Sequence, residues 1–410
     1  MVVEFMNIAV AQSGGPTAAI NASLAGVFVE AVKNDEIKKV YGFKNGIEGV
    51  LRNDAVDLSE YLSDNRDIEI LKLTPSTVLG SCRLKLKSFE ENEEQYKKIL
   101  EVFESLDIGA FFYIGGNDSM DTVLKLSDYF KSVGKDIKVM GIPKTIDNDL
   151  VLTDHTPGFG SAAKYIATTV AEIIRDSQVY ALTSVTVIEI MGRDAGWLTA
   201  ATSVLRRMGE DAPHLIYLPE VPVTKEQILE QIKDAHNHHK ACIVAVSEGI
   251  KTPDGKYLAE DNLSGCVDVF GHKYLSGVGK YLENLISTEL SCKVRSVELN
   301  VMQRCSSHLA SLTDIDESQE IGSAAVRYAL SGHTGEMMIF ERKGNNPYAV
   351  EISSADIRDI ANKEKLFPRE WINEKGNNIK DEAIDYFMPL IQGEVNLFKE
   401  NGLPVHLRIK

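Results

Sequence analysis

The chain has few of the features that mark secreted, metal-binding or membrane proteins. It contains 5 cysteines among 410 residues. They lie far apart, without the paired spacing of a zinc site, at Cys82, Cys242, Cys266, Cys292 and Cys305. Their odd number fits reduced thiols better than a disulfide framework, so we expect a cytoplasmic protein.

Long apolar runs and excess positive charge are also missing. No stretch of about 18 uncharged apolar residues occurs, and no basic flank precedes an apolar core near the N-terminus, so we expect neither a membrane span nor a signal peptide. The net charge of -16 argues against a general nucleic-acid binder, because phosphate backbones attract basic surfaces. Any anion site must therefore be a local exception.

What the sequence does contain is an alternation of short apolar runs with longer helical patterns. This alternation is typical of an α/β fold with a mainly parallel sheet. The apolar runs that lead into polar or glycine-rich motifs are residues 6–11, 110–114, 137–142, 185–190, 241–246 and 294–299. Ligands of open α/β sheets bind at the carboxyl ends of the strands, so we expect these motifs to converge on one cleft. A polar stretch at Val151–Pro157 separates two series of runs, before a helical stretch from Ser161 to Asp176.

The run Pro143–Asp149 sets one cation and two carboxylates within a few residues of each other, just after an apolar run. This is the chemistry of phosphoryl transfer. Lys144 can neutralise a phosphate, one aspartate can take a proton from an attacking hydroxyl, and another can hold Mg²⁺. The same residue types also favour a simple turn.

Two glycine motifs follow apolar runs of the first series. Gly14 and Gly15 could bring backbone N–H groups to an anion at a helix N-terminus, or could form only a tight turn. The motif Gly115–Ser119 repeats this design, and its polar tail offers metal or phosphate contacts. A helix cap explains that tail equally simply.

The second series contributes candidate anion and sugar contacts. Arg193 stands in a Gly-Arg-Asp turn, where its guanidinium could clamp phosphate oxygens or form an internal ion pair. Glu248 could accept hydrogen bonds from sugar hydroxyls or lie on the surface. Arg295 and Arg304 could bind a substrate phosphate.

A histidine tract in this half looks like a metal site but lacks the necessary partners. His236, His238 and His239 have no carboxylate or cysteine at a convincing spacing, so we interpret them as solvated. Gly277–Lys280 likewise lacks the leading glycine and the Ser or Thr of a phosphate-binding P-loop.

Taken in order, the motifs resemble those of the phosphofructokinase family over roughly residues 6–340. The resemblance implies two doubly wound, mainly parallel-sheet α/β domains with the active site in the cleft between them. We expect a donor-binding domain at 1–152, completed by part of 303–360, and a sugar-phosphate-binding domain at 153–302. Residues 361–410 are expected to form a C-terminal helical segment, to which we assign no role.

The resemblance also implies roles for individual residues. Asp147 would be the base that activates the C1 hydroxyl of fructose 6-phosphate, and the Mg²⁺ cofactor would be held by Asn117 and Asp149. Donor-binding positions would be Gly14, Gly15, Arg83, Gly116, Asp118 and Lys144. Substrate-binding positions would be Thr145, Asp147, Met191, Gly192, Arg193, Glu248, Arg295 and Arg304, and the catalytic residues would be Asp118, Lys144, Asp147 and Arg193.

Two positions select the phosphoryl donor. Asp118 and Lys144 stand where ATP-dependent members of the family typically have glycine, and they are the residues of the pyrophosphate-dependent members. A carboxylate at Asp118 would repel the α-phosphate of ATP, whereas the ammonium of Lys144 could neutralise pyrophosphate. The resemblance therefore implies reversible transfer from pyrophosphate to fructose 6-phosphate, a step of glycolysis.

Three positions depart from the family pattern. Ser184 replaces a usual arginine or lysine that reaches across a subunit interface, Val301 replaces a histidine or tyrosine, and Asn117 replaces an aspartate near magnesium. An ATP-dependent 6-phosphofructokinase, a sedoheptulose 7-phosphate kinase and a noncatalytic regulatory subunit stay open as alternatives. The resemblance implies a homodimer or homotetramer.

Overall fold

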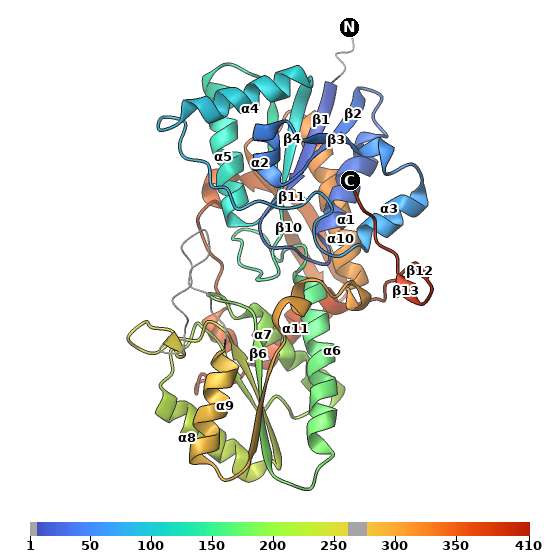
Figure 1. Cartoon of the computed structure of the whole chain (residues 1–410). Helices are drawn as coiled ribbons and strands as arrows, with labels where there is room; N and C mark the ends of the chain where they lie inside the picture. Colours follow the sequence, from blue (N-terminus) through green and yellow to red (C-terminus); the bar gives the residue numbers. More distant parts are fainter. Residues whose placement is uncertain (1–5, 261–276) are drawn as a thin grey trace.

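The protein is built on two large β-sheets, each covered by helices on both faces (Figure 1). The computed structural model describes residues 6–260 and 277–410; Cys266 lies outside these ranges. The first sheet has the strand order β11-β10-β5-β4-β1-β2-β3, and the second has the order β7-β8-β6-β9. Most neighbouring strands are parallel, which confirms the predicted α/β class.

The first sheet has a parallel centre and antiparallel edges. Strand β1 pairs in parallel with β2 and β4, β5 pairs with β4, and β10 pairs with β5. Strands β3 and β11 are antiparallel to their neighbours. The strands of this sheet are β1 (Met6–Gln12), β2 (Ile37–Phe43), β3 (Ala55–Asp57), β4 (Ile108–Gly115), β5 (Lys138–Pro143), β10 (Glu336–Asn345) and β11 (Tyr348–Asp356). Residues after 303 thus return to this sheet, whereas the exact domain boundaries stay a prediction.

The second sheet is wholly parallel among its named strands. Strand β6 pairs with β8 and β9, and β8 pairs with β7. The strands are β6 (Ser184–Ile190), β7 (Leu215–Tyr217), β8 (Ala241–Ser247) and β9 (Lys293–Glu298). Parallel strands covered on both faces read as continuous apolar runs, which is why the apolar runs of the sequence located β1, β4, β5, β6 and β8 correctly.

Alternate residues of each strand enter cores on opposite faces of the sheet. Ile8 and Val10 of β1 pack toward α1 and α10, whereas Ala9 and Ala11 pack toward α4 and α5.

In the described part of the chain, no helix is both long and apolar enough to cross a membrane. The α-helices are α1 (Ile20–Ala31), α2 (Gly46–Arg52), α3 (Asn65–Lys72), α4 (Glu93–Ser105), α5 (Asn117–Ser132), α6 (Phe159–Gln178), α7 (Trp197–Ala200), α8 (Lys225–His238), α9 (Val278–Glu289), α10 (Leu312–Leu330) and α11 (Asp381–Phe387).

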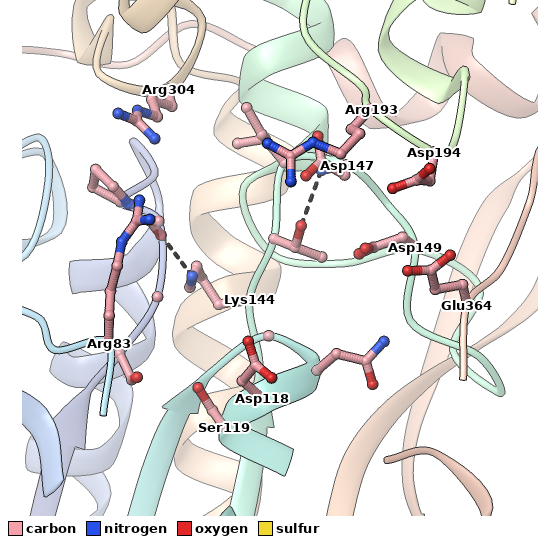
Figure 2. A pocket seen from close by; sticks show the side chains of 18 of the residues that line it. Arg83, Asp118, Ser119, Lys144, Asp147, Asp149, Arg193, Asp194, Arg304 and Glu364 are labelled. Carbon is pink, nitrogen blue, oxygen red and sulfur yellow. Dashed lines mark hydrogen bonds between the residues drawn. The ribbon is translucent and has the colours of Figure 1, made fainter. Parts of the chain in front are cut away.

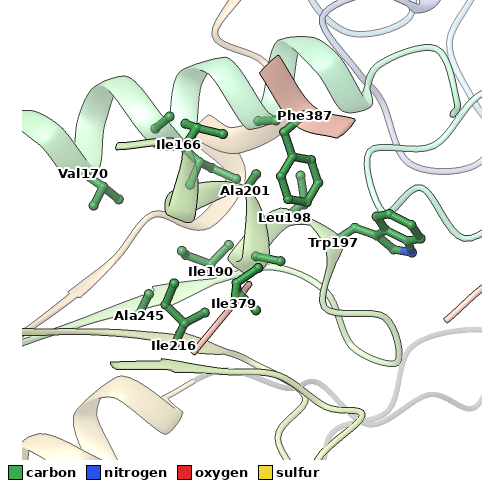
Figure 3. Close-up of a cluster of buried hydrophobic side chains, with 14 of the residues drawn as sticks. Ile166, Val170, Ile190, Trp197, Leu198, Ala201, Ile216, Ala245, Ile379 and Phe387 are labelled. Carbon is green, nitrogen blue, oxygen red and sulfur yellow. The ribbon is translucent and has the colours of Figure 1, made fainter. Parts of the chain in front are cut away.

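The C-terminal segment 361–410 ties the two halves of the fold together. Its α-helical content is limited to α11, joined by short 3₁₀ turns and the hairpin β12 (Lys399–Glu400) and β13 (Leu403–Pro404). Ile379 and Phe387 pack with Trp197 and Ile190 in the core of the second sheet (Figure 3). The chain then returns to the first half, where the backbone N–H of Leu407 donates to Thr74.

Candidate active site

The carboxyl ends of strands from both sheets meet at one pocket of about 650 Å³ (Figure 2). The loops after β1, β4 and β5 contribute one part of its wall, and the loops after β6 and β8 contribute another. The motifs therefore converge on one pocket, as expected. Predicted site residues that line the pocket are Gly14, Gly15, Arg83, Gly116, Asn117, Asp118, Lys144, Thr145, Asp147, Asp149, Met191, Arg193, Glu248 and Arg304.

Lys144 joins the loops at the ends of three neighbouring strands. It follows β5 and is almost completely buried, with 2% of its surface exposed. Its Nζ donates to the backbone oxygen of Gly15 at 2.6 Å, and its backbone N–H donates to Gly115 at 2.9 Å. Burial lowers the pKa of Lys144 to about 8. Gly14 has φ +77°, and a Cβ there would lie 3.2 Å from this ammonium, so a glycine suits the turn for two reasons.

Asp147 and Asp149 flank a left-handed turn in the same loop. Asn148, between them, has φ +54° and is fully buried. The backbone N–H of Asp147 donates to Oγ1 of Thr145 at 3.1 Å. Burial, and then the charge of Asp149, raises the pKa of Asp147 to about 7, and burial also raises the pKa of Asp149. A cation bound here would relieve the repulsion between these carboxylates.

The C-terminal segment anchors this loop from behind. Lys365 is half-buried, and its Nζ donates to Oδ1 of Asn148 at 3.3 Å and to the carbonyls of Thr153 and Asp154 at 3.0 and 2.8 Å. Nδ2 of Asn148 donates to the Tyr386 hydroxyl at 2.9 Å, which itself donates to the Asp154 carbonyl at 2.6 Å. Burial lowers the pKa of Lys365 to about 8. Both polar ends of the Asn148 amide are therefore held by residues more than 200 positions away.

The motif after β4 forms the first turn of helix α5, which borders the pocket. Asp118, in its first turn, accepts a hydrogen bond from Nζ of Lys85 at 3.2 Å across a half-exposed surface. Asn117 faces the C-terminal segment, since its Oδ1 accepts from the backbone N–H of Asn362 at 2.9 Å and its Nδ2 donates to the Lys363 carbonyl at 2.7 Å. The two neighbouring side chains thus have different partners.

The loops of the second sheet complete the pocket opposite the glycine turn. Gly192 has φ +129°, and a Cβ there would lie only 2.6 Å from the Ala195 carbonyl. Its backbone N–H donates to Oε1 of Glu248 at 3.3 Å. Burial, followed by the charge of Asp147, raises the pKa of Glu248 to about 8. Arg193 reaches over Asp147 (Figure 2), and its charge partly offsets the upward shift in the Asp147 pKa.

The two arginines predicted to bind a substrate phosphate lie in different places. Arg304 lines the pocket, and its Nη1 is 3.7 Å from where a Cβ of Gly15 would stand. Arg295 does not line this pocket. It projects from β9 toward α6, where its Nη1 lies 2.9 Å from Oδ2 of Asp176. Gly192 shapes the loop without being among the lining residues.

A family model described as Phosphofructokinase matches residues 7–329. The chain belongs to the phosphofructokinase family. A pyrophosphate–fructose 6-phosphate 1-phosphotransferase of Halomonas elongata is 42% identical over 398 residues, covering 96% of this chain and 94% of that protein. One of Xanthomonas campestris pv. campestris is 42% identical over 407 residues, covering 98% and 96%. The crystal structure of a pyrophosphate-dependent phosphofructokinase from Marinobacter aquaeolei has a TM-score of 0.87 at 37% identity, covering 99% of this chain and 96% of that one.

The pocket also contains residues that sequence reasoning missed. Asp194 lines it and pairs with Lys251 at 2.9 Å, and its place in the Gly-Arg-Asp turn could have indicated it. Asn362 and Glu364 line it from the C-terminal segment. No local motif surrounds them, so their place depends on the tertiary fold.

The histidine tract has more partners than the sequence indicates. The ring of His239 lies against that of His214, tilted by 34° with centroids 3.8 Å apart. Asp211 lies 3.5 Å from Nδ1 of His239, whereas His238 is largely exposed. Nδ1 of His214 accepts from the backbone N–H of Ile243 at 2.9 Å. The neutral ring therefore carries its proton on Nε2, the atom that faces Asp211, and cannot offer that atom to a metal.

Proposed function

We propose that this protein transfers a phosphoryl group from pyrophosphate to the C1 hydroxyl of fructose 6-phosphate, giving fructose 1,6-bisphosphate and phosphate in a reversible step of glycolysis. The similarity to pyrophosphate-dependent enzymes over nearly the whole chain supports this activity. The observation that carries the donor assignment is the ammonium of Lys144, buried directly beneath the Gly14–Gly15 turn.

The donor would lie against the glycine turn, with Lys144 and Arg83 supplying positive charge. A preplaced cation in a buried site stabilises charge that develops during transfer far better than it would in water. Asp118 would exclude ATP, because its carboxylate borders the same pocket and would repel an additional phosphate. Its contact with Lys85 holds that carboxylate at the pocket wall.

Asp147 would act as the general base. The C1 oxygen attacks one phosphorus of pyrophosphate, the bridging P–O bond breaks, phosphate leaves, and the hydroxyl proton passes to Asp147. The elevated pKa of about 7 makes this carboxylate a competent proton acceptor near neutral pH. Arg193, which reaches over Asp147, would stabilise the transferred group.

Magnesium fits the chemistry of this pocket, because buried carboxylates and phosphate oxygens are the hard ligands that the ion prefers. Asp149 would hold it, and bound Mg²⁺ would neutralise charge on pyrophosphate. Asn117 is the second ligand that the family resemblance implies. Both polar atoms of the Asn117 amide are hydrogen-bonded to the backbone of residues 362 and 363.

For the acceptor, Glu248 would bind sugar hydroxyls, while Met191, Arg193 and Arg304 would surround the phosphate-bearing end. Arg295 lies outside the pocket of the single chain, so a role for it in sugar-phosphate binding would require a second subunit. We therefore propose a homodimer or homotetramer. A cytoplasmic location is supported by the described cysteines, which are free thiols: Cys82, Cys242, Cys292 and Cys305.

Steady-state kinetics with purified protein test this proposal and its alternatives. Fructose 1,6-bisphosphate formation should require pyrophosphate and Mg²⁺ and should be slow with ATP. Sedoheptulose 7-phosphate is the informative second acceptor, because Ser184 and Val301 are smaller than the usual family residues. A higher kcat/KM with sedoheptulose 7-phosphate would overturn the acceptor assignment, and no turnover with any donor would favour a regulatory subunit.

A further inference from the structure

A short piece of the C-terminal segment, residues 362–365, crosses the pocket wall between two catalytic loops. We call it the bridging segment. At one end, Asn117 bonds to the backbone of both Asn362 and Lys363, at 2.9 and 2.7 Å. At the other end, the backbone N–H of Lys365 donates to the carbonyl of Asp149 at 2.7 Å. The bridging segment therefore links the start of helix α5 to the loop that contains the catalytic aspartates.

Glu364 is the residue between these two anchors. The peptide before it is held by Asn117 and the peptide after it is held by Asp149, so the direction of its side chain is restricted from both sides. Glu364 lines the pocket, and Figure 2 shows its carboxylate on the same side as those of Asp149 and Asp194. The segment thus delivers a carboxylate to the region where Asp149 would hold magnesium.

Asn117 is poorly placed to be the second metal ligand. Its Oδ1 already accepts a backbone hydrogen bond and its Nδ2 donates another. The amide is also neutral, whereas Mg²⁺ in phosphate sites is usually bound by one or two carboxylates together with substrate oxygens. Because position 117 has no carboxylate, Asp149 would be the only negatively charged residue of the two implied ligands, Asn117 and Asp149. A carboxylate at Glu364 would supply the missing charge.

We propose that Glu364 is the second carboxylate of the magnesium–pyrophosphate site and that Asn117 is a positioning residue, which holds the bridging segment so that Glu364 faces the metal. This inference rests on the proposed function. It also assigns a role to a segment that carries no motif. Glu364 would contact Mg²⁺ directly or through one of its waters, and Asn117 would act only through the backbone of residues 362 and 363.

Metal binding can be measured without turnover. Mn²⁺ is the probe, titrated into the full-length protein with methylenediphosphonate, a pyrophosphate analogue that does not transfer its phosphoryl group, and free Mn²⁺ is followed by electron paramagnetic resonance. Glu364→Gln should raise the Kd for Mn²⁺ by about tenfold or more, the range seen when a supporting group of a metal site is removed. Glu364→Asp should recover part of the loss. Glu374→Gln is the matched control, because it removes an exposed carboxylate of the C-terminal segment 361–410 that lies outside both the bridging segment and the pocket, and it should not change the Kd.

The positioning role of Asn117 has its own signature. Asn117→Ala should raise the Kd for Mn²⁺ in the wild-type background, but it should add little in the Glu364→Gln background, since both changes remove the same contact. An unchanged Kd in Glu364→Gln, with normal binding by the wild-type protein, contradicts the role of Glu364 and leaves the proposed function intact. Failure of the wild-type protein to take up Mn²⁺ with the analogue contradicts both.

Discussion

The ammonium of Lys144 lies 2.6 Å from the backbone oxygen of Gly15, beneath the turn where the phosphoryl donor is expected to bind. This contact joins the end of β5 to the end of β1, so the cation is held by the fold before any substrate arrives. Burial keeps water from screening its charge. We propose that this desolvated cation is the structural basis for the use of pyrophosphate.

Replacing Lys144 with methionine should lower kcat with pyrophosphate by about 100-fold to 1,000-fold, because a preplaced charge is lost from the transition state. The change removes the donor to the Gly15 carbonyl, but Gly15 is exposed and water can replace that donor, so the free energy of unfolding should fall by only about 1 kcal/mol. Thermal unfolding should therefore still be cooperative. Near-normal kcat in a folded Lys144→Met protein would show that the cation is not catalytic.

The double change Asp118→Gly and Lys144→Gly should shift donor preference toward ATP. Removing the carboxylate opens the pocket wall beside α5, and removing the ammonium takes away the group that neutralises pyrophosphate. The ratio of kcat/KM for ATP to that for pyrophosphate should rise by at least about tenfold, as expected when one repulsive charge is removed from a binding site. Asp118→Asn tests the charge alone, because it removes the negative charge and keeps the size of the side chain. If neither variant uses ATP better than the wild-type enzyme, Asp118 does not exclude it.

The pH profile of kcat/KM should be bell-shaped and narrow. The base Asp147 must be ionised, and its pKa of about 7 places the acid limb near pH 7, so activity falls as pH drops below it. Lys144 must be protonated, and its pKa of about 8 places the alkaline limb near pH 8. Lys144→Arg, whatever its maximum rate, should move only the alkaline limb upward, because arginine keeps its proton. An unmoved alkaline limb would assign that limb to another group.

The anchor behind the catalytic loop gives a fourth prediction. Lys365→Met removes the donor to Asn148 and to two carbonyls and should reduce kcat by about tenfold or more, because small displacements of catalytic groups are costly. Lys164 is the matched control, since its ammonium is also enclosed by the fold and donates to a backbone carbonyl, that of Gly393, but it does not line the pocket or contact the loop. Lys164→Met should lower the melting temperature with little change in kcat. Equal loss of kcat in both variants would mean that Lys365 has only a general structural role.

Lys365→Arg and Tyr386→Phe refine that test. Arginine keeps the charge near Asn148 and should restore part of the rate. Tyr386→Phe removes the two hydrogen bonds of the phenol hydroxyl, from Asn148 and to the Asp154 carbonyl, and should cost less than the loss of Lys365. An effect on KM alone, with kcat unchanged, would contradict a role in holding the loop.

The strand ends and their motifs could be predicted from the sequence because both signals are local. An apolar run followed by glycine or a charged residue located the loops that contain Lys144, Arg193 and Glu248, and parallel topology brings such loops to one edge. The contact between Asn117 and Asn362 could not be predicted, since it joins residues 245 positions apart and no motif surrounds Asn362. The part of the pocket built by residues 362–365 was missed for that reason.

Other discrepancies have similar causes. The spacing of the histidine tract excluded a partner in sequence, but Asp211 approaches His239 from another loop. Arg295 matches the family pattern by position, yet its side chain leaves an edge strand toward Asp176. Sequence position specifies the strand, while the direction of the side chain depends on register and on the helix that covers that face.

The most direct test of pyrophosphate as donor is ³¹P nuclear magnetic resonance of the wild-type protein mixed with Mg²⁺, pyrophosphate and fructose 6-phosphate. The pyrophosphate signal should decline while the signals of phosphate and of the new C1 phosphate ester grow in equal amounts. The same end point should be reached from fructose 1,6-bisphosphate and phosphate. An unchanged pyrophosphate signal, alongside conversion of ATP in a parallel sample, would contradict the account.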